Sequence, residues 1–407
     1  MFNFQHQAWF VQPALQRVWR ALNTPHSEAR AVGGCVRNAM LGLPVADVDL
    51  AINVPPEKTE EILAHAGVVT KRTGFAHGTI MAIEGGQGFE ITSLRQDVAT
   101  DGRRAVVAYT DDWKTDAARR DFTFNAMSVD VEGRLYDYFG GVNDLAARLV
   151  RFIGDPAQRL AEDYLRLLRY FRFLAWYGVM GDAAADPNRQ TAEACREAAP
   201  HLATLSVERV WSEVKKILSA ENPVPALALM EAWQVMPHVF KTPVSLPRLH
   251  DVVALEHKMG AAPHALVRLV ALALPDQESA ENLSQHWHVS NDEAALLIKA
   301  SQRPVVDWFS LPAVRVGLYR HGAAAMRAWY VLMAAQQGFH KTEAWNLIQH
   351  WKVPALPISG RDVQGLGIQA GPEMGKILQE VAEWWQQNDF MPGKTDCLDY
   401  VRRRITK

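Results

Sequence analysis

The pattern of apolar residues changes near residue 150 of the 407-residue chain. Before that point, short runs rich in β-branched and aromatic residues alternate with glycine pairs and polar turns, which is typical of strands joined by tight turns. After it, apolar residues recur at three- and four-residue spacing, the pattern of helices that bury one face. The sequence therefore predicts an α/β head followed by an all-α remainder.

The individual elements follow from the same two periodicities. In the head, strands are predicted at 29–33, 47–52, 68–73, 79–83, 89–94 and 126–130, and helices at 35–41 and 57–66. The remainder is predicted to hold helices at 160–176, 207–218, 225–235, 263–274, 292–300, 312–321, 323–337, 341–349 and 372–387. The polar stretch 96–118 has too little apolar content to pack on its own and is predicted to be a mobile loop.

Composition restricts the partners and the compartment. Lys and Arg number 43 against 45 Asp and Glu, so any nucleic-acid surface has to be a local patch. The three cysteines lie far apart, which excludes a disulfide framework and a zinc cluster and fits a reducing compartment. The first ten residues lack the features of a signal peptide, and the apolar run 265–274 is too short to cross a bilayer. We expect a cytoplasmic protein with no membrane and no obligate protein partner.

Two aspartates and a glycine pair form the most informative segment. Asp47 and Asp49 are two residues apart in a predicted strand, so they would share one face, about 6–7 Å apart. Carboxylates this close repel each other, and a hard cation such as Mg²⁺ relieves the repulsion. Gly33 and Gly34 let the backbone approach a phosphate at the start of a helix, where Arg37 could grip an oxygen.

A second charged motif, Arg119-Arg120-Asp121, precedes the last predicted strand of the head. Two planar guanidinium groups can neutralise and orient a triphosphate. Asp121 could accept a hydrogen bond from a ribose hydroxyl or hold one of the arginines in place. Glu90, on the strand before the polar stretch, is a candidate third acidic group near the metal, although a solvated carboxylate fits equally well.

With these motifs the chain resembles the nucleotidyltransferase superfamily that includes DNA polymerase β, and more closely the class II tRNA nucleotidyltransferases (CCA-adding enzymes) and bacterial poly(A) polymerases. The resemblance implies a head with a mixed five-stranded sheet. It implies two Mg²⁺ ions at Asp47 and Asp49, and an incoming nucleotide bound by Arg119, Arg120 and Asp121. It also implies that the stretch 96–118 is a flexible loop needed to add the final A.

Four polar residues form a ridge on the helix predicted after the head, and two of them could select which base is added. Asp163, Arg166, Arg169 and Arg172 are spaced by three residues. Cytosine and adenine both offer an amine beside a ring-nitrogen acceptor, which an Asp and an Arg can match together. Uracil and guanine present the reverse pattern, and two unpaired groups at about 1–3 kcal/mol each give roughly 10²–10⁴-fold rejection. In the resembling family this motif selects the base, with the next two arginines lining the nucleotide site.

The resemblance spans most of the chain and predicts five parts: an N-terminal helix (1–28), the nucleotidyltransferase head (29–150), a helical neck (151–220), a helical body (221–353) and a helical tail (354–407). The expected activity is addition of C, C and A to the 3′ end of tRNA from CTP and ATP. A poly(A) polymerase or an A-adding-only tRNA nucleotidyltransferase shares the head and stays an alternative. A catalytically dead tRNA-binding module and a phosphohydrolase centred on His250 and Asp251 are more distant ones.

Overall fold

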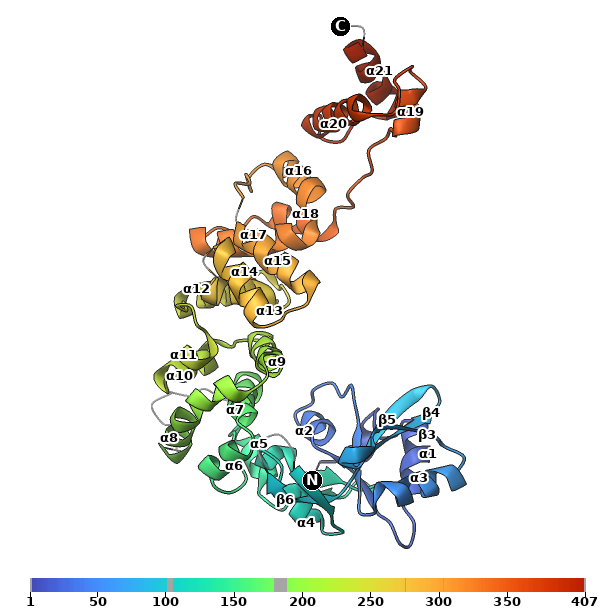
Figure 1. The fold of residues 1–407 in the computed structure, drawn as a ribbon, viewed down its shortest axis with the longest axis vertical. Helices are drawn as coiled ribbons and strands as arrows, with labels where there is room; N and C mark the ends of the chain where they lie inside the picture. Colours follow the sequence, from blue (N-terminus) through green and yellow to red (C-terminus); the bar gives the residue numbers. More distant parts are fainter. Residues whose placement is uncertain (1, 101–104, 179–188, 275, 303, 406–407) are drawn as a thin grey trace. The chain divides into compact units, whose positions relative to one another are not determined.

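The computed structural model in Figure 1 describes residues 2–100, 105–178, 189–274, 276–302 and 304–405. Contacts between Cα atoms divide the chain into two compact units, Met1–Lys241 and Thr242–Lys407. The first unit holds the sheet and the helices up to α11, and the second holds helices α12 to α21. The boundaries predicted at residues 28, 150, 220 and 353 stay predictions.

A mixed sheet forms the centre of the first unit. In the described part of the chain it has seven strands in the order β3-β4-β5-β2-β1-β8-β9, with β2 and β5 parallel and the other neighbours antiparallel. Its strands are β1 (Ala29–Val32), β2 (Asp49–Ile52), β3 (Val69–Gly74), β4 (Thr79–Glu84), β5 (Gln87–Ser93), β8 (Ser128–Val129) and β9 (Leu135–Tyr136). The α/β head is confirmed, but its sheet has seven strands and not the five that the resemblance implied. The strand predicted at 126–130 is present as β8, whereas β9 was not predicted, since it pairs through only two residues.

Strand β1 lies inside the sheet, between β2 and β8, and all four of its residues are buried. Helices α1 (Pro13–Leu22) and α3 (Pro56–His65) contact each other. Helix α1 also contacts β1 and β4, and α3 contacts β3, β4 and β5, so the two helices cover one face of the sheet (Figure 1). The Trp19 indole of α1 donates to the Ala29 carbonyl at 2.8 Å, which fixes that helix to the central strand. Helix α2 (Gly34–Met40) follows β1 directly.

The stretch predicted to be a loop contains regular structure. Strands β6 (Arg95–Thr100) and β7 (Ala105–Tyr109) form an antiparallel two-stranded sheet, and helix α4 (Trp113–Ala118) follows. The loop prediction for 96–118 is therefore wrong at residues 96–100, 105–109 and 113–118. Residues 105–109 are alanine, valine and tyrosine, which suit a strand, and the Asp112 side chain caps α4 by accepting from the amides of Lys114 and Thr115.

The helix predicted over 160–176 is two helices, α6 (Pro156–Glu162) and α7 (Leu165–Tyr177). Asp163 lies between them in an extended conformation (φ −155°), and its carboxylate accepts from the Leu165 amide at 3.1 Å. The apolar spacing continues across this break, so the sequence pattern did not reveal it. The other helices of this unit are α5 (Gly141–Ala146), α8 (Arg189–Ala198), α9 (Val207–Leu218), α10 (Val224–Ala232) and α11 (Met236–Val239).

The described part of the second unit contains no strand. Its helices are α12 (Leu246–Met259), α13 (Ala265–Ala273), α14 (Gln277–His286), α15 (Asn291–Gln302), α16 (Leu311–His321), α17 (Ala323–Gln337), α18 (Thr342–His350), α19 (Gly360–Gln364), α20 (Pro372–Gln387) and α21 (Lys394–Ile405). One apolar core joins α12, α16, α17 and α18, and another joins α19, α20 and α21. The predicted all-helical second part is confirmed.

Candidate active site

The turn after β1 and the start of β2 lie side by side. Val32 pairs with Asp49 across the antiparallel strands, so the glycine pair that follows Val32 is next to this carboxylate. Gly33 has φ +71°, a left-handed conformation that favours glycine, and a Cβ there would come within 3.5 Å of the Arg120 guanidinium. The glycine turn therefore brings backbone, carboxylate and arginine together.

The acidic residues predicted for the metal gather at one hollow. Asp47, Asp49 and Glu90 all line a cavity next to β4 and β5. Asp47 lies before β2, which begins at Asp49, so the prediction that both aspartates share one strand is wrong. Burial raises the pKa of Asp49, the negative charges of Glu90 and Asp47 add to that, and Arg120 opposes it. Oxygen donors whose charges repel one another suit a hard cation.

Among the described residues, no group of three or more His, Cys, Asp or Glu side chains is arranged closely enough to hold a metal ion. Two carboxylates with nucleotide phosphates as further ligands are the usual arrangement for Mg²⁺. Asp47 and Asp49 thus fit a divalent cation that is held jointly with a nucleotide, and Glu90 lies in the same hollow without completing a protein-only site.

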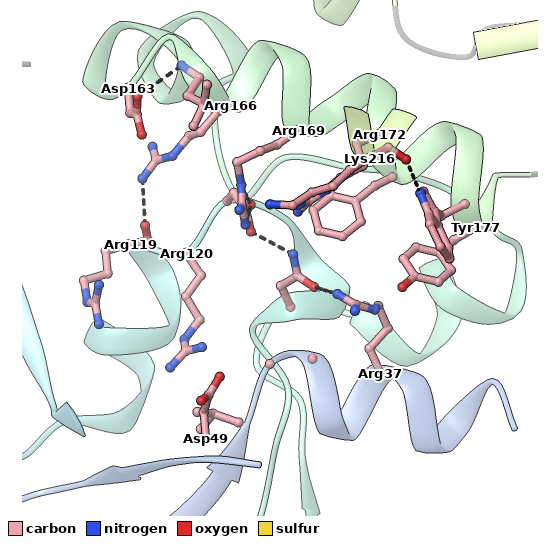
Figure 2. A pocket seen from close by; sticks show the side chains of 18 of the residues that line it. Arg37, Asp49, Arg119, Arg120, Asp163, Arg166, Arg169, Arg172, Tyr177 and Lys216 are labelled. Carbon is pink, nitrogen blue, oxygen red and sulfur yellow. Dashed lines mark hydrogen bonds and ion pairs between the residues drawn. The ribbon is translucent and has the colours of Figure 1, made fainter. Parts of the chain in front are cut away.

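A second cavity, of about 610 Å³, is also lined by Asp49 and is called the arginine-lined cavity below (Figure 2). Eight of the side chains that line it are cationic and three carry a carboxylate. The cationic ones are Arg37, Arg119, Arg120, Arg166, Arg169, Arg172, Arg209 and Lys216, and the acidic ones are Asp49, Asp121 and Asp163. Such an excess of positive charge fits a polyanionic ligand.

Arg119 and Arg120 are held by an acid that the sequence analysis missed. Buried Asp116, on α4, forms ion pairs with Arg119 at 2.7 Å and Arg120 at 3.2 Å, and it accepts from the Arg95 amide at 3.2 Å. Burial opposes the charge of Asp116, but the two arginines outweigh it and lower its pKa. Figure 2 shows Arg120 pointing toward Asp49. Asp116 was not proposed as a site residue because it lies in the stretch that was predicted to be a loop.

Asp121 connects the head to helix α7. It is buried, and it accepts from Arg169 Nε at 2.7 Å and from Asn125 Nδ2 at 2.9 Å. The oxygen of Asn125 in turn accepts from Arg37 Nη1 at 2.6 Å, so Asp121 and Asn125 join two arginines that are far apart in the sequence (Figure 2). Burial opposes the charge of Asp121, but Arg169 keeps its pKa below the usual value. Asn125 had no recognisable sequence signal.

Asp163 and Arg166 both line the arginine-lined cavity. Asp163 Oδ2 accepts from Arg209 Nη2 at 2.9 Å, and Arg166 Nη2 donates to the Arg119 carbonyl at 3.0 Å. Arg166 also donates to Glu162 and to the Arg159 carbonyl. These bonds tie the start of α7 to the segment that carries the arginine motif.

Arg169 and Arg172 follow along α7 and line the same cavity. Arg172 forms an ion pair with buried Glu213 of α9 at 3.2 Å. The three-residue spacing therefore places Arg166, Arg169 and Arg172 together as predicted. Asp163 joins them from outside the helix, because α7 begins at Leu165.

Comparison with known proteins agrees with this geometry. Residues 29–151 match the family described as the poly A polymerase head domain, and residues 186–245 match the probable RNA and SrmB-binding site of polymerase A. The chain is 34% identical over 393 residues to the mouse CCA tRNA nucleotidyltransferase 1, mitochondrial, covering 92% of this chain and 87% of that relative. The chain belongs to the CCA tRNA nucleotidyltransferase family. A family member from Streptococcus gordonii, named a CCA-adding enzyme, is 31% identical and covers 93% of this chain and 94% of its own.

Solved structures of CCA-adding enzymes share the fold. The Bacillus stearothermophilus enzyme in complex with CTP aligns with a TM-score of 0.71 at 22% identity, covering 97% of this chain and 98% of that one. The Thermotoga maritima enzyme complexed with tRNA aligns with a TM-score of 0.62 at 18% identity, covering 97% and 96%. The predicted membership of the family is confirmed.

The structure offers nothing for a phosphohydrolase centre at His250 and Asp251. Both side chains are more than half exposed on α12, and they contact each other at 3.4 Å. A metal phosphohydrolase needs further ligands, and no metal-binding group of three occurs among the described residues. None of the described helices has both the length and the apolar character needed to span a membrane.

Proposed function

We propose that this chain adds C, C and A to the 3′ end of tRNA, taking CTP and ATP as substrates and using no nucleic-acid template. One observation carries the proposal: Asp49, the arginine motif and the pair Asp163 and Arg166 line one cavity. Relatives that align over most of the chain are named for this activity. Solved structures of the same fold include CCA-adding enzymes in complex with CTP, with ATP and with tRNA.

The metal is proposed to be Mg²⁺, bound by Asp47 and Asp49 as two ions, with Glu90 as a candidate third acidic group. Hard oxygen donors and a nucleotide triphosphate suit this cation. When bound, Mg²⁺ lowers the pKa of the terminal 3′-hydroxyl and neutralises the leaving pyrophosphate. The proposed role of the two carboxylates is to supply negative charge for the metal: Asp49 does so beside Arg120, and Asp47 lines the same hollow as Asp49.

The triphosphate is proposed to lie against Arg37, Arg119 and Arg120, with the backbone of Gly33 and Gly34 close to it. The bonds of Asp116 to both motif arginines fix their guanidinium groups before the ligand arrives. A site that is ordered in advance loses less conformational entropy on binding. Asp121 is proposed to hold Arg169, to which it is hydrogen-bonded, and to accept a hydrogen bond from the ribose.

Base choice is proposed to rest on Asp163 and Arg166, supported by Arg169 and Arg172. A carboxylate has about four acceptor positions, so Asp163 can accept from an amine while it stays bonded to Arg209 and to the Leu165 amide. Arg166 donates to the ring nitrogen. Uracil and guanine would place a carbonyl against Asp163 and an N–H against Arg166, and both contacts are unfavourable.

An extension assay on two RNAs tests the proposal. When wild-type protein is given CTP, ATP and a tRNA that lacks its CCA end, extension of the tRNA should stop after three nucleotides. When the same protein is given an A-rich oligomer and ATP alone, it should not add a long A tail. A long homopolymer tail would favour a poly(A) polymerase, and extension only of tRNA that already ends in CC would favour an A-adding enzyme. An unchanged yield on Asp49→Ala would contradict the assigned carboxylate.

We propose the cytoplasm as the compartment, on the basis of three buried cysteines that form no disulfide, which fits a reducing environment. The mouse and human relatives are named mitochondrial, so the test has to distinguish the cytoplasm from mitochondria. Fractionation of the source cells should place the protein in the cytoplasmic fraction.

A further inference from the structure

Trp176 has no role in the function proposed above. It lies in the last turn of α7, lines the same cavity as the arginines, and leaves 47% of its surface exposed. Its indole N–H donates to the Lys216 carbonyl of α9 at 2.8 Å. This bond joins two helices, so the ring is held in position and does not swing freely into solvent. A fixed, half-exposed aromatic ring is a suitable platform for a flat ligand.

The neighbouring aromatic rings, those of Phe173 and Tyr177, already contact other side chains of the protein. Phe173 is buried and stacks on Tyr177 with ring centres 5.8 Å apart. The guanidinium of Arg37 lies 4.6 Å from the centre of the Tyr177 ring. Trp176 is the aromatic side chain with the most exposed surface among those that line the cavity in the described part of the chain.

The ligand of Trp176 is not the incoming base. Trp176 lies ten residues after Arg166 on one helix, which at 1.5 Å per residue is about 15 Å along its axis. A base that bonds to Arg166 and Asp163 does not reach a ring that far away. A second base is therefore needed, and the reaction requires one: the base at the end of the RNA acceptor.

Positive charge accompanies the ring. Lys216 and Arg172 line the cavity beside Trp176, and both form ion pairs with the single carboxylate of Glu213 (Figure 2 labels the two cations). Half of the Lys216 side chain is exposed. An aromatic face next to cations is the arrangement by which proteins bind single-stranded nucleic acid, through stacking and phosphate contacts.

We propose that Trp176 stacks on a base at the 3′ end of the RNA acceptor, with Lys216 contacting an adjacent phosphate. The proposal rests on the proposed function, which makes RNA the acceptor. Stacking accepts every base, because every base has a π face. This suits an end that changes with each addition, since hydrogen-bond recognition at this position would reject some of the intermediates.

Binding measurements on three variants test the platform. We expect Trp176→Ala to weaken binding of tRNA that lacks CCA by about five- to 150-fold, without a comparable change for CTP or ATP. Trp176→Leu keeps apolar bulk and should behave like the alanine variant. Trp176→Phe keeps an aromatic face and should bind the RNA within about threefold of wild type. Wild-type affinity in the leucine variant, or an equal loss for nucleotides, would overturn the proposal.

Fluorescence provides a second readout that does not depend on catalysis. Adding the same tRNA to wild-type protein should quench part of the tryptophan emission, and that part should be missing in Trp176→Phe. The matched control is Trp9→Phe, because Trp9 packs against Phe4 and Phe10 and does not line the cavity. Equal quenching in both variants would contradict stacking on Trp176. If wild-type protein bound tRNA but added no CCA, the proposed function would fail while these comparisons still tested the platform.

Discussion

At the scale of single residues, the carboxylate of Asp163 carries the proposed base choice. Asp163→Asn replaces one acceptor with a donor, so rejection of UTP and GTP relative to CTP and ATP should fall by about tenfold to a hundredfold. The measurement is kcat/KM for the four nucleotides. Arg209→Gln is the matched control, because it removes a partner of Asp163 and keeps the carboxylate. We expect the control to lower kcat/KM for all four nucleotides alike. The same uniform loss in Asp163→Asn would contradict base selection.

Cys35 gives a prediction about reactivity. Burial raises the pKa of the Cys35 thiol to about 12, and the negative charge of Asp49 contributes. At pH 8 a thiol with this pKa is a thiolate in only about one molecule in 10⁴, and the thiolate is the reactive form. Cys195 and Cys397 are also buried. We expect no fast-reacting thiol in the native protein at pH 8 and three in denaturant, measured with a chromogenic disulfide. Fast labelling of Cys35 in the native state would refute this.

At the scale of elements, Glu162 links α6 and α7 to the arginine motif. Its carboxylate pairs with Arg159 and Arg166, which also donate to the carbonyls of Ala118 and Arg119. Because this side chain is only 20% exposed, Glu162→Gln should lower the free energy of unfolding by about 1–2 kcal/mol. It should also raise KM for both nucleotides.

Denaturant unfolding and steady-state kinetics check the Glu162 prediction. The control is Glu61→Gln, which breaks an ion pair with Lys58 whose side chains are both about half exposed. Exposed pairs contribute little, so this variant should resemble wild type. If the two variants lost equal stability, the proposed stabilising role of Glu162 between α6, α7 and the arginine motif would be contradicted.

The hairpin of β6 and β7 gives a prediction about the last addition. The resemblance to the family assigns this segment to the addition of A. Replacing residues 97–107 with a short glycine linker should therefore leave C addition intact and abolish A addition. The Arg95 amide and Asp116 stay in place, so the arginine motif keeps its support. Extension of tRNA lacking CCA, resolved nucleotide by nucleotide, is the measurement. Equal loss of both additions would instead assign the hairpin a structural role.

Elements with a strong apolar pattern could be predicted from the sequence, and those with a weak one could not. The predicted bounds of α9, α17 and α20 agree with the structure because large apolar residues recur along each helix. Helix α8 was missed, since its buried positions hold only Thr, Ala and Cys. Candidate site residues were recognised as motifs, whereas Asp116 and Asn125 act through contacts that a local pattern does not contain.

At the scale of the whole molecule, charge is distributed unevenly. The formal net charge is −2, yet the arginine-lined cavity of the first unit has eight cationic and three acidic lining side chains. Attraction to a polyanion is therefore local, and the overall negative charge limits indiscriminate binding to nucleic acid. The sequence could exclude a uniformly basic surface, but it could not reveal where the cations meet, because they come from α2, the turn after α4, α7 and α9.

Local attraction of this kind predicts how tRNA binding responds to salt. Each phosphate neutralised releases condensed counterions, so raising monovalent salt from 50 to 200 mM should weaken tRNA binding by about 3.5-fold for every phosphate contacted. The kcat at saturating tRNA should change much less, since the arginines around the bound nucleotide are held by Asp116 and Asp121. Replacing Lys216 with Met should reduce the salt slope by about one phosphate contact. The slope comes from titrations of tRNA at constant Mg²⁺, and a slope near zero would exclude phosphate contacts as the main source of affinity.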